Sequence, residues 1–373
     1  MQLPRITPGL RPGAWTRLAA SLVAAAASPA SAAGPEAAPT PPASQAAAPD
    51  FSTSKQSVRV PFARPVDFDK LTAMRVRVSL NGGPPTTFLV DTGSVGVIVS
   101  AKEVPNIDPN APPGSITYSS SGISLEGVWT PVTIAFLDAK DEHGKPPTAV
   151  VPVLAAKERK VAPGAVNGGK AKGSTDPKVY MFGIGFGRGK ESHPERNPFV
   201  NLKEMQAATM RRGYTITRDG FTLGLTPAVA KPDFLYQKLK ERTVSPETTA
   251  MKPGLKDWES PRGSVTINGE AGPEGTVLLD TGLTNMMVGK VGLPEQTDVS
   301  DGAPVTVNLM DGRLHYDFQV GDAANPTTPR RVTLLKRTEG ATLNTGLKAF
   351  AAFDYLYDAE GGYLGLRPTA KDR

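Results

Sequence analysis

The chain has 373 residues, enough for two ordinary domains or one large unit of two β-rich lobes with a sizeable core. It contains no cysteine, which excludes disulfides, thiol nucleophiles and cysteine-ligated zinc. Its 42 basic and 36 acidic residues give a net charge of +6, too weak a bias to indicate nucleic-acid binding. With 38 glycines and 36 prolines, the composition favours many short strands joined by turns, so we expect a mostly β protein.

The N-terminal segment, residues 1–32, has the features of a signal peptide. Three arginines precede an apolar run over residues 18–27, and Ala30-Ser31-Ala32 supplies the small residues of a cleavage site. The run is too short to span a bilayer, so the sequence predicts an exported protein, periplasmic or extracellular, without stable membrane association after cleavage. An uncleaved membrane anchor is the alternative. Residues 33–56 are rich in Ala and Pro and are predicted to be a linker, with a short propeptide as the alternative.

The folded region is expected to begin at residue 57. Alternating apolar and polar residues over 74–80 predict a half-buried strand, and a turn rich in Gly and Pro leads into a second strand that ends at Asp91. Farther along, a β-type run ends at Tyr118, breaks into small residues and returns over 128–136. We interpret this pattern as a hairpin whose tip could close over a binding site, or as an ordinary surface hairpin.

The middle of the chain gives weaker signals. Residues 138–178 are rich in Lys, Gly and Pro, and we predict that much of this stretch is a surface insertion. The glycines between 181 and 187 fit close strand packing better than a phosphate loop. Residues 197–210 are predicted to form a helix with Pro198 in its first turn. The folded region is expected to form two lobes, residues 57–220 and 221–373.

The strongest signal is an internal repeat. Asp91-Thr92-Gly93-Ser94 follows one apolar run, and Asp280-Thr281-Gly282-Leu283 follows another, 189 positions later. In each copy a second apolar run comes next. A single Asp-Thr-Gly is more often a plain turn. Two copies with matching flanks, one in each half of the chain, indicate instead a pair of carboxylates delivered by two related lobes.

These motifs resemble those of the pepsin-like aspartic peptidases, and the likeness covers roughly residues 57 to 370. The tetrapeptide at Asp91 matches the family's first active-site motif, and Asp280-Thr281-Gly282 matches the second. Three further segments resemble, in order, the family's flap strand, the segment after the first lobe's core glycine and the closing hairpin: residues 115–118, 197–202 and 355–366. The resemblance implies an all-β, bilobal pepsin-like fold, with two related β-barrel lobes and a cleft between them.

The sequence departs from the family pattern in three places. Leu283 stands where the family usually has Ser or Thr, whose hydroxyl supports the neighbouring carboxylate. The triplet Asn344-Thr345-Gly346 is more polar than the usual pair of apolar residues followed by Gly. Tyr118 lies only 27 positions after Asp91, closer than in typical members.

The chemistry expected of Asp91 and Asp280 is peptide hydrolysis by an activated water. Two carboxylates within hydrogen-bonding reach do not readily ionise together, so they share one proton, and either could hold it. The pair can then activate water and polarise a carbonyl, as in aspartic proteases generally. The expected supporting residues are those that brace the two loops, allow close approach, donate to Asp91 and form the flap over the substrate: Thr92 and Thr281, Gly93 and Gly282, Ser94, and Tyr118, Ser119 and Ser120.

Leu283 suggests a consequence for pH. Because leucine cannot donate a hydrogen bond to Asp280, we expect the dyad to hold its shared proton more tightly and to work at less acidic pH than a pair supported by Ser or Thr. The alternative is that the bulk of Leu283 displaces Asp280 and leaves a lobe that binds without cutting. The three histidines, at positions 143, 193 and 315, show no metal-binding spacing, so we expect no metal. The neutral polar character of the expected site implies no cofactor.

The sequence therefore predicts an exported aspartic endopeptidase, a monomer that acts on a peptide or unfolded protein substrate and binds no nucleic acid. The substrate is expected to lie as an extended strand between the lobes. A catalytically inactive peptide- or protein-binding module on the same scaffold is the first alternative. An exported β-barrel protein with a fortuitous repeat is the second, and it requires Asp91 and Asp280 to lie far apart.

Overall fold

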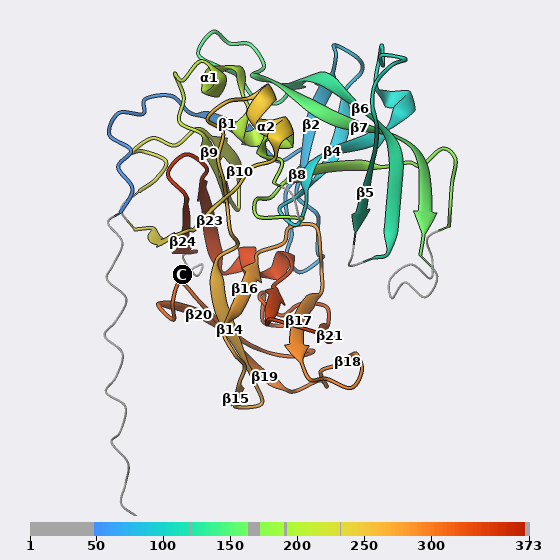
Figure 1. Ribbon diagram of the computed structural model, residues 1–373. Helices are drawn as coiled ribbons and strands as arrows, with labels where there is room; N and C mark the ends of the chain where they lie inside the picture. The colour runs from blue at the N-terminus through green and yellow to red at the C-terminus, as the bar shows by residue number, and fades with distance from the viewer. Residues whose placement is uncertain (1–47, 119–120, 163–171, 190–191, 232, 370–373) are drawn as a thin grey trace, which may run out of the picture. The chain divides into compact units, whose positions relative to one another are not determined.

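A computed structural model describes residues 48–118, 121–162, 172–189, 192–231 and 233–369 (Figure 1). Strands and turns make up most of this part of the chain, which confirms the all-β class. Its two α-helices are short: α1 spans Lys203–Gln206 and α2 spans Pro246–Met251. Within these ranges, no helix has the length and apolar character needed to cross a membrane. Residues 1–32 lie outside them, so the signal peptide stays a prediction.

The first large sheet has seven strands and carries Asp91 at the end of one of them. In spatial order the strands are β2 (Arg75–Leu80), β3 (Thr86–Asp91), β8 (Tyr180–Ile184), β4 (Val95–Ser100), β7 (Thr148–Val161), β6 (Ile123–Phe136) and β5 (Pro113–Tyr118). An additional pairing of β2 with β6 closes six of these strands into a ring. A closed ring leaves few exposed strand edges.

The strands of the second large sheet come from the sequence on either side of Asp280. Its strands in spatial order are β18 (Thr297–Asp298), β21 (Val332–Arg337), β17 (Met286–Val291), β22 (Thr342–Asn344), β16 (Gly275–Leu278), β14 (Arg262–Ile267), β19 (Pro304–Leu309) and β20 (Leu314–Gln319), with the short β15 (Glu270–Ala271) paired to β14.

The repeat seen in the sequence is also present in the strand pairing. In the first sheet β3 runs parallel to β8, β8 antiparallel to β4, and β4 parallel to β7. In the second sheet β16 runs parallel to β22, β22 antiparallel to β17, and β17 parallel to β21. Four strands of each sheet therefore share one topology around their Asp-Thr-Gly sequence, which confirms the internal repeat.

A third sheet combines strands from distant parts of the chain. Its order is β1 (Val58–Pro61), β10 (Gly220–Leu223), β9 (Gly213–Thr217), β23 (Phe353–Asp358), β24 (Tyr363–Pro368) and β11 (Leu235–Lys238), and a separate pair is formed by β12 (Glu241–Arg242) and β13 (Asp257–Trp258). The predicted closing hairpin is present as β23 and β24. The lobe boundary predicted after residue 220 falls inside β10, in a sheet that both predicted lobes share.

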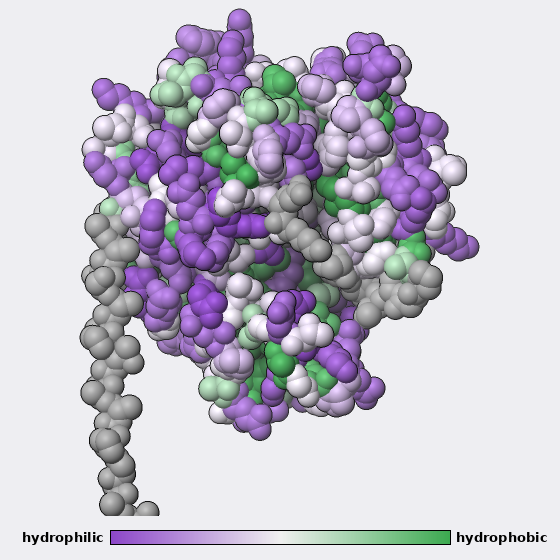
Figure 2. Space-filling model, in the orientation of Figure 1, coloured by the Kyte–Doolittle hydropathy of each residue, from purple (hydrophilic) through white to green (hydrophobic). Residues whose placement is uncertain are grey.

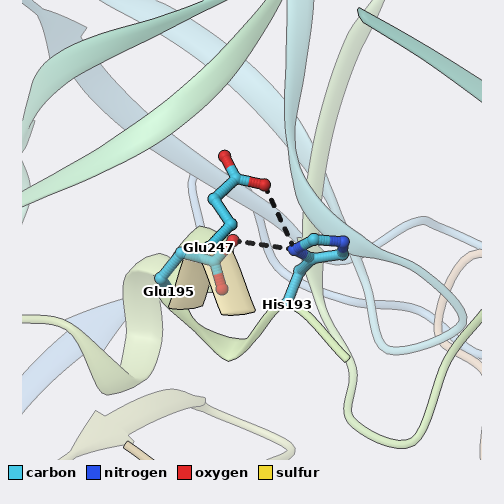
Figure 3. Close-up of side chains that lie close together, drawn as sticks. All are labelled: His193, Glu195 and Glu247. Atoms are coloured by element: carbon cyan, nitrogen blue, oxygen red, sulfur yellow. Dashed lines mark hydrogen bonds and ion pairs between the residues drawn. The ribbon is translucent and has the colours of Figure 1, made fainter. Parts of the chain in front are cut away.

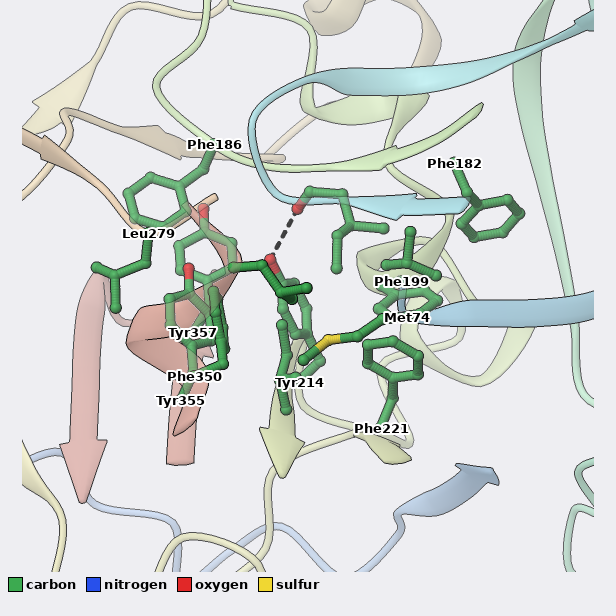
Figure 4. Close-up of a cluster of buried hydrophobic side chains, with 14 of the residues drawn as sticks. Met74, Phe182, Phe186, Phe199, Tyr214, Phe221, Leu279, Phe350, Tyr355 and Tyr357 are labelled. Carbon is green, nitrogen blue, oxygen red and sulfur yellow. Dashed lines mark hydrogen bonds between the residues drawn. The ribbon is translucent and has the colours of Figure 1, made fainter. Parts of the chain in front are cut away.

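One hydrophobic core joins the three sheets (Figure 4). Phe182 of β8, Tyr214 of β9 and Tyr355 of β23 all belong to it. The buried hydroxyl of Tyr214 donates a hydrogen bond to the Ile184 carbonyl at 2.8 Å, so its polar atom is satisfied. Burial of such large side chains contributes about 1.5–3 kcal/mol each. On the face shown in Figure 2, hydrophilic residues predominate and hydrophobic residues gather only in small groups.

Two local predictions are wrong and one is incomplete. The surface insertion predicted over much of 138–178 is wrong, because this range contains β7, in which Val151 and Val153 are buried. The apolar run of β7 is flanked by lysine-rich sequence, which led to the wrong prediction. The predicted helix over 197–210 shortens to α1. The linker predicted over 33–56 already joins the fold by Phe51, which is buried.

The helix is interrupted because Asn197 binds the backbone instead. Its side-chain oxygen accepts from the Phe199 N–H at 2.9 Å, and its amide donates to the Ile184 carbonyl at 2.7 Å. This capping produces a 3-10 turn at Pro198–Val200. At the other end Ala208 has a φ of 56°, which stops an α-helix.

Candidate active site

The two Asp-Thr-Gly sequences meet face to face. Asp91 is 6% exposed and Asp280 7% exposed. A methyl group placed on Gly93 would lie 2.6 Å from Asp280 Oδ2, and one placed on Gly282 would lie 2.5 Å from Asp91 Oδ1. Each carboxyl therefore rests on the glycine of the opposite loop, where no side chain fits. The alternative of a fortuitous repeat, with the two aspartates far apart, is contradicted by this geometry.

Two threonines brace the loops below the carboxyls. The Thr92 N–H donates to Thr281 Oγ1 at 3.0 Å, and the Thr281 N–H donates to Thr92 Oγ1 at 2.9 Å. Each hydroxyl then donates across to the other loop, from Thr92 to the Leu279 carbonyl at 2.6 Å and from Thr281 to the Val90 carbonyl at 2.8 Å. These four buried hydrogen bonds are related by a pseudo-twofold axis, and they have the geometry expected of the predicted cross-brace.

The loop glycines and a serine orient the carboxyls. The Gly93 N–H donates to Asp91 Oδ1 at 2.7 Å, and the Gly282 N–H donates to Asp280 Oδ1 at 2.8 Å. The Ser94 hydroxyl donates to Asp91 Oδ2 at 2.5 Å, as the sequence predicts. Both oxygens of Asp91 therefore accept a hydrogen bond from within its own loop.

The second carboxyl obtains its side-chain donor from another strand. Leu283 supplies none, but Nδ2 of Asn344, the last residue of β22, donates to Asp280 Oδ2 at 2.6 Å. The premise that Asp280 lacks a side-chain donor is therefore wrong. Sequence reasoning noted Leu283 and Asn344 as two separate departures. The signal that connects them is that the repeat loses a polar group at one position and gains one at the other.

The charge state of the dyad depends mainly on burial. Desolvation and the negative charge of Asp280 raise the pKa of Asp91 to about 7, although the hydrogen bonds from Ser94 and Gly93 act in the opposite direction. The two carboxyls are therefore close enough for the charge of one to affect the ionisation of the other. A single shared proton is the natural state of such a pair.

Tyr118 ends β5 beside the dyad. Its pKa is raised by burial and by the nearby charge of Asp91, and its hydroxyl lies near Ser94 without completing a hydrogen bond to any described residue. An unsatisfied buried hydroxyl is costly, so a group that enters the site is a natural partner for it. Ser119 and Ser120, also predicted for the flap, lie outside the described residues.

Arg188 lies near the dyad, although the sequence motifs did not predict it as a residue of the site. Its Nε donates to the Phe186 carbonyl at 3.1 Å, and its Nη2 donates to the Ser260 hydroxyl. With Thr92, Arg188 lines a small cavity. Burial lowers the pKa of Arg188, and the charge of Asp280 opposes this effect. The glycines before it do pack closely, since a Cβ on Gly185 would lie 2.2 Å from the Thr92 carbonyl oxygen.

Three potential metal ligands meet outside the dyad: His193, Glu195 and Glu247 (Figure 3). His193 Nδ1 lies 3.0 Å from Glu195 Oε1 and 3.8 Å from Glu247 Oε2. Arg196 contacts both glutamates, at 3.1 and 3.0 Å. Its guanidinium offsets part of their negative charge, so these side chains form an ion-pair network that does not require a metal.

No protein-family model matches the sequence, and a comparison with curated proteins finds no significant match. Arguments about function therefore depend on the geometry of the site.

Proposed function

We propose that the protein is an exported aspartic endopeptidase with a bilobal, pepsin-like fold. The observation that carries the proposal is the pairing of two buried carboxyls, Asp91 and Asp280, on loops that brace each other through Thr92 and Thr281. The repeated topology around each aspartate supports two related lobes. A peptide or unfolded protein is the proposed substrate, bound as an extended strand by a monomer.

The reaction proposed for the dyad needs no nucleophilic side chain and no cofactor. One carboxylate accepts a proton from a water molecule as the water oxygen attacks the peptide carbonyl, and the other carboxyl donates its proton to the carbonyl oxygen. The resulting tetrahedral diol collapses when the leaving nitrogen takes up the first proton and a diol hydroxyl returns the second. Tyr118 is placed to hydrogen-bond a substrate that covers the dyad.

The expected pH range follows from the raised pKa of Asp91. At about 7, this pKa lets the pair retain its single proton from acid up to near-neutral conditions. We therefore expect activity to extend to less acidic pH than the ordinary Asp value implies and to fall above about pH 7. The cause is burial and the charge of Asp280, and it is not the missing hydroxyl at Leu283. An optimum at or below about pH 3 would count against this reasoning.

The test is cleavage of an unfolded protein by the purified, processed chain, scanned from acidic to neutral pH. Asp91→Asn and Asp280→Asn are the catalytic variants, and Asp219→Asn, at an exposed turn, is the matched control. We expect the wild type and the control to cut and both dyad variants to be inactive, with all four proteins folded by circular dichroism.

Equal inactivity of the folded wild type and the dyad variants would refute the peptidase. The alternative, an inactive peptide-binding module, would then be favoured if the same proteins still bound unfolded peptide. Leu283 and the polar triplet at 344–346 are the features that motivate this alternative, but Asp280 keeps hydrogen bonds from Gly282 and Asn344. Binding of a peptide inhibitor whose hydroxyl mimics the transition state separates the two, since only a well-formed dyad should hold it.

A further inference from the structure

We propose that Asn344 is a positioning residue for Asp280, in place of a hydroxyl at position 283, and that it fixes Asp280 as the ionised member of the dyad. This inference rests on the proposed peptidase function. It assigns different tasks to two carboxyls that the repeat alone would treat as equivalent.

The first support is an exchange of polar and apolar residues between the two halves. Ser94 corresponds to Leu283 at the spacing of 189 residues that separates the two motifs. In the strand registers Leu89 pairs with Met181, and Leu278, its counterpart, pairs with Asn344. The first half therefore has serine in the loop and methionine on the neighbouring strand, whereas the second half has leucine in the loop and asparagine on the strand.

The second support is the rigidity of Asn344. Its side-chain oxygen accepts from the Gly346 N–H at 3.0 Å, which leaves the nitrogen facing Asp280. Its backbone lies between two strands, paired with Leu278 on one side and Met287 on the other. Because the backbone of Asn344 is paired on both sides and its side-chain oxygen is held by the Gly346 N–H, its amide can orient the Asp280 carboxylate at little entropic cost.

Gly346 allows this strand to approach the Asp280 loop. Its φ is +67°, and a Cβ there would lie 2.5 Å from the Asn285 carbonyl oxygen and 3.0 Å from that of Leu283. The Leu347 N–H also donates to the Leu283 carbonyl at 2.7 Å. The unusual triplet at 344–346 therefore forms a single device, in which the asparagine supplies the donor and the glycine allows the contact.

The third support is the chemistry of the two donors. The Ser94 hydroxyl can donate to an ionised Asp91 or accept from a protonated one, so it suits both states. The Asn344 nitrogen can only donate, so its hydrogen bond favours the ionised form of Asp280. Arg188 acts in the same direction, because it places positive charge near Asp280. Tyr118 is the titratable group near Asp91, and its raised pKa keeps it uncharged.

If Asp280 is ionised and Asp91 is protonated, each proton transfer can be assigned to one carboxyl. Asp280 accepts the proton of the attacking water, and Asp91 gives its proton to the peptide carbonyl oxygen. On collapse Asp280 passes its proton to the leaving nitrogen, and Asp91 recovers one from the diol hydroxyl. The dyad ends in its starting state with one water consumed.

The test compares wild type, Asn344→Ala and the double variant Asn344→Ala/Leu283→Ser on an unfolded protein substrate. A charged hydrogen bond has a strength that corresponds to about 10- to 100-fold in rate, so we expect Asn344→Ala to lose kcat by that factor with KM little changed. The double variant provides a hydroxyl at the position equivalent to Ser94, and we expect it to recover most of kcat. Unchanged kcat in Asn344→Ala, or no recovery in the folded double variant, overturns the proposal.

A second measurement does not depend on activity. In the wild-type protein, the side-chain amide protons of Asn344 should shift in nitrogen-15 NMR spectra as the dyad titrates, and Asp91→Asn should abolish that titration. If the wild type is inactive yet the amide signals titrate, the positioning role stands and the peptidase proposal fails. If the amide signals change neither with pH nor in Asp91→Asn, the positioning role is overturned, whatever the activity. This measurement does not use Asn344→Ala, so it remains valid if that variant does not fold.

Discussion

Replacing Asp91 with Asn should make the protein more stable at neutral and alkaline pH while it abolishes cleavage. The raised pKa of Asp91 means that the folded protein binds this proton more tightly than the unfolded chain does. That contribution to stability is fully present below about pH 4 and is lost as pH rises through about 7. Asparagine is neutral at every pH and keeps the acceptor oxygen that the Gly93 N–H contacts, so the variant avoids the loss.

The size of the effect follows from the two pKa values. The change from 3.8 to about 7 is equivalent to about 4 kcal/mol, since a difference of one corresponds to about 1.4 kcal/mol. This is an upper limit, because the two carboxyls titrate together. We expect Asp91→Asn to exceed the wild type by about 2–4 kcal/mol in free energy of unfolding at pH 8, and to match it near pH 4.

Urea denaturation at several pH values, followed by circular dichroism, measures the difference. Asp219→Asn serves as the control, because it removes an exposed carboxyl that is not part of the dyad. Asp280→Asn should gain less than Asp91→Asn at pH 8, because it removes the repulsion between the carboxyls but leaves Asp91 desolvated by burial. If Asp91→Asn follows the wild-type curve from pH 4 to pH 8, the carboxyls do not interact as described.

Three more changes test the surroundings of the dyad. Gly93→Ala should abolish cleavage in a folded protein because its methyl group would lie 2.6 Å from Asp280 Oδ2, whereas Gly173→Ala, with its nearest contact at 3.4 Å, should be neutral in the same assay. Thr281→Ala should lower the free energy of unfolding, measured in urea, by about 1–3 kcal/mol, because the buried Val90 carbonyl and Thr92 N–H lose their hydrogen-bond partner. Thr281→Ser keeps the hydroxyl and should retain most of the wild-type stability. Arg188→Met should move the acidic limb of the pH–rate profile to higher pH by removing positive charge near Asp280, and Arg188→Lys should move it less. An unchanged profile in Arg188→Met would contradict this last expectation.

The sequence was sufficient to predict the residues that meet at the centre of the site. Asp91 and Asp280 each lie in a short, strongly patterned motif, and a repeat of such a motif implies a shared geometry. The all-β class followed from alternating runs and turn residues for a similar reason. Local chemistry and repetition are both readable along the chain.

Features that depend on strand register could not be predicted in this way. Leu283 and Asn344 are far apart in sequence, and only the pairing of β22 with β16 and β17 brings the amide to Asp280. Arg188 follows a glycine-rich strand whose packing, and therefore whose direction, is a tertiary property. The strand β7 could not be recognised from composition, because the stretch over which composition is judged is longer than its apolar run and includes its lysine-rich flanks.

The reciprocal brace also determines when the site can exist during synthesis. Asp91 and Thr92 emerge early with their loop unbraced, and the Thr281 hydroxyl that completes that loop follows Thr92 by 189 residues. Asn344 comes later still, and β23, which joins the third sheet to β9, is among the last strands made. Such long-range pairings form slowly. A nascent or truncated chain that lacks Asp280 therefore carries only one carboxyl of the dyad. The complete dyad forms only when nearly all of this sequence has been synthesised.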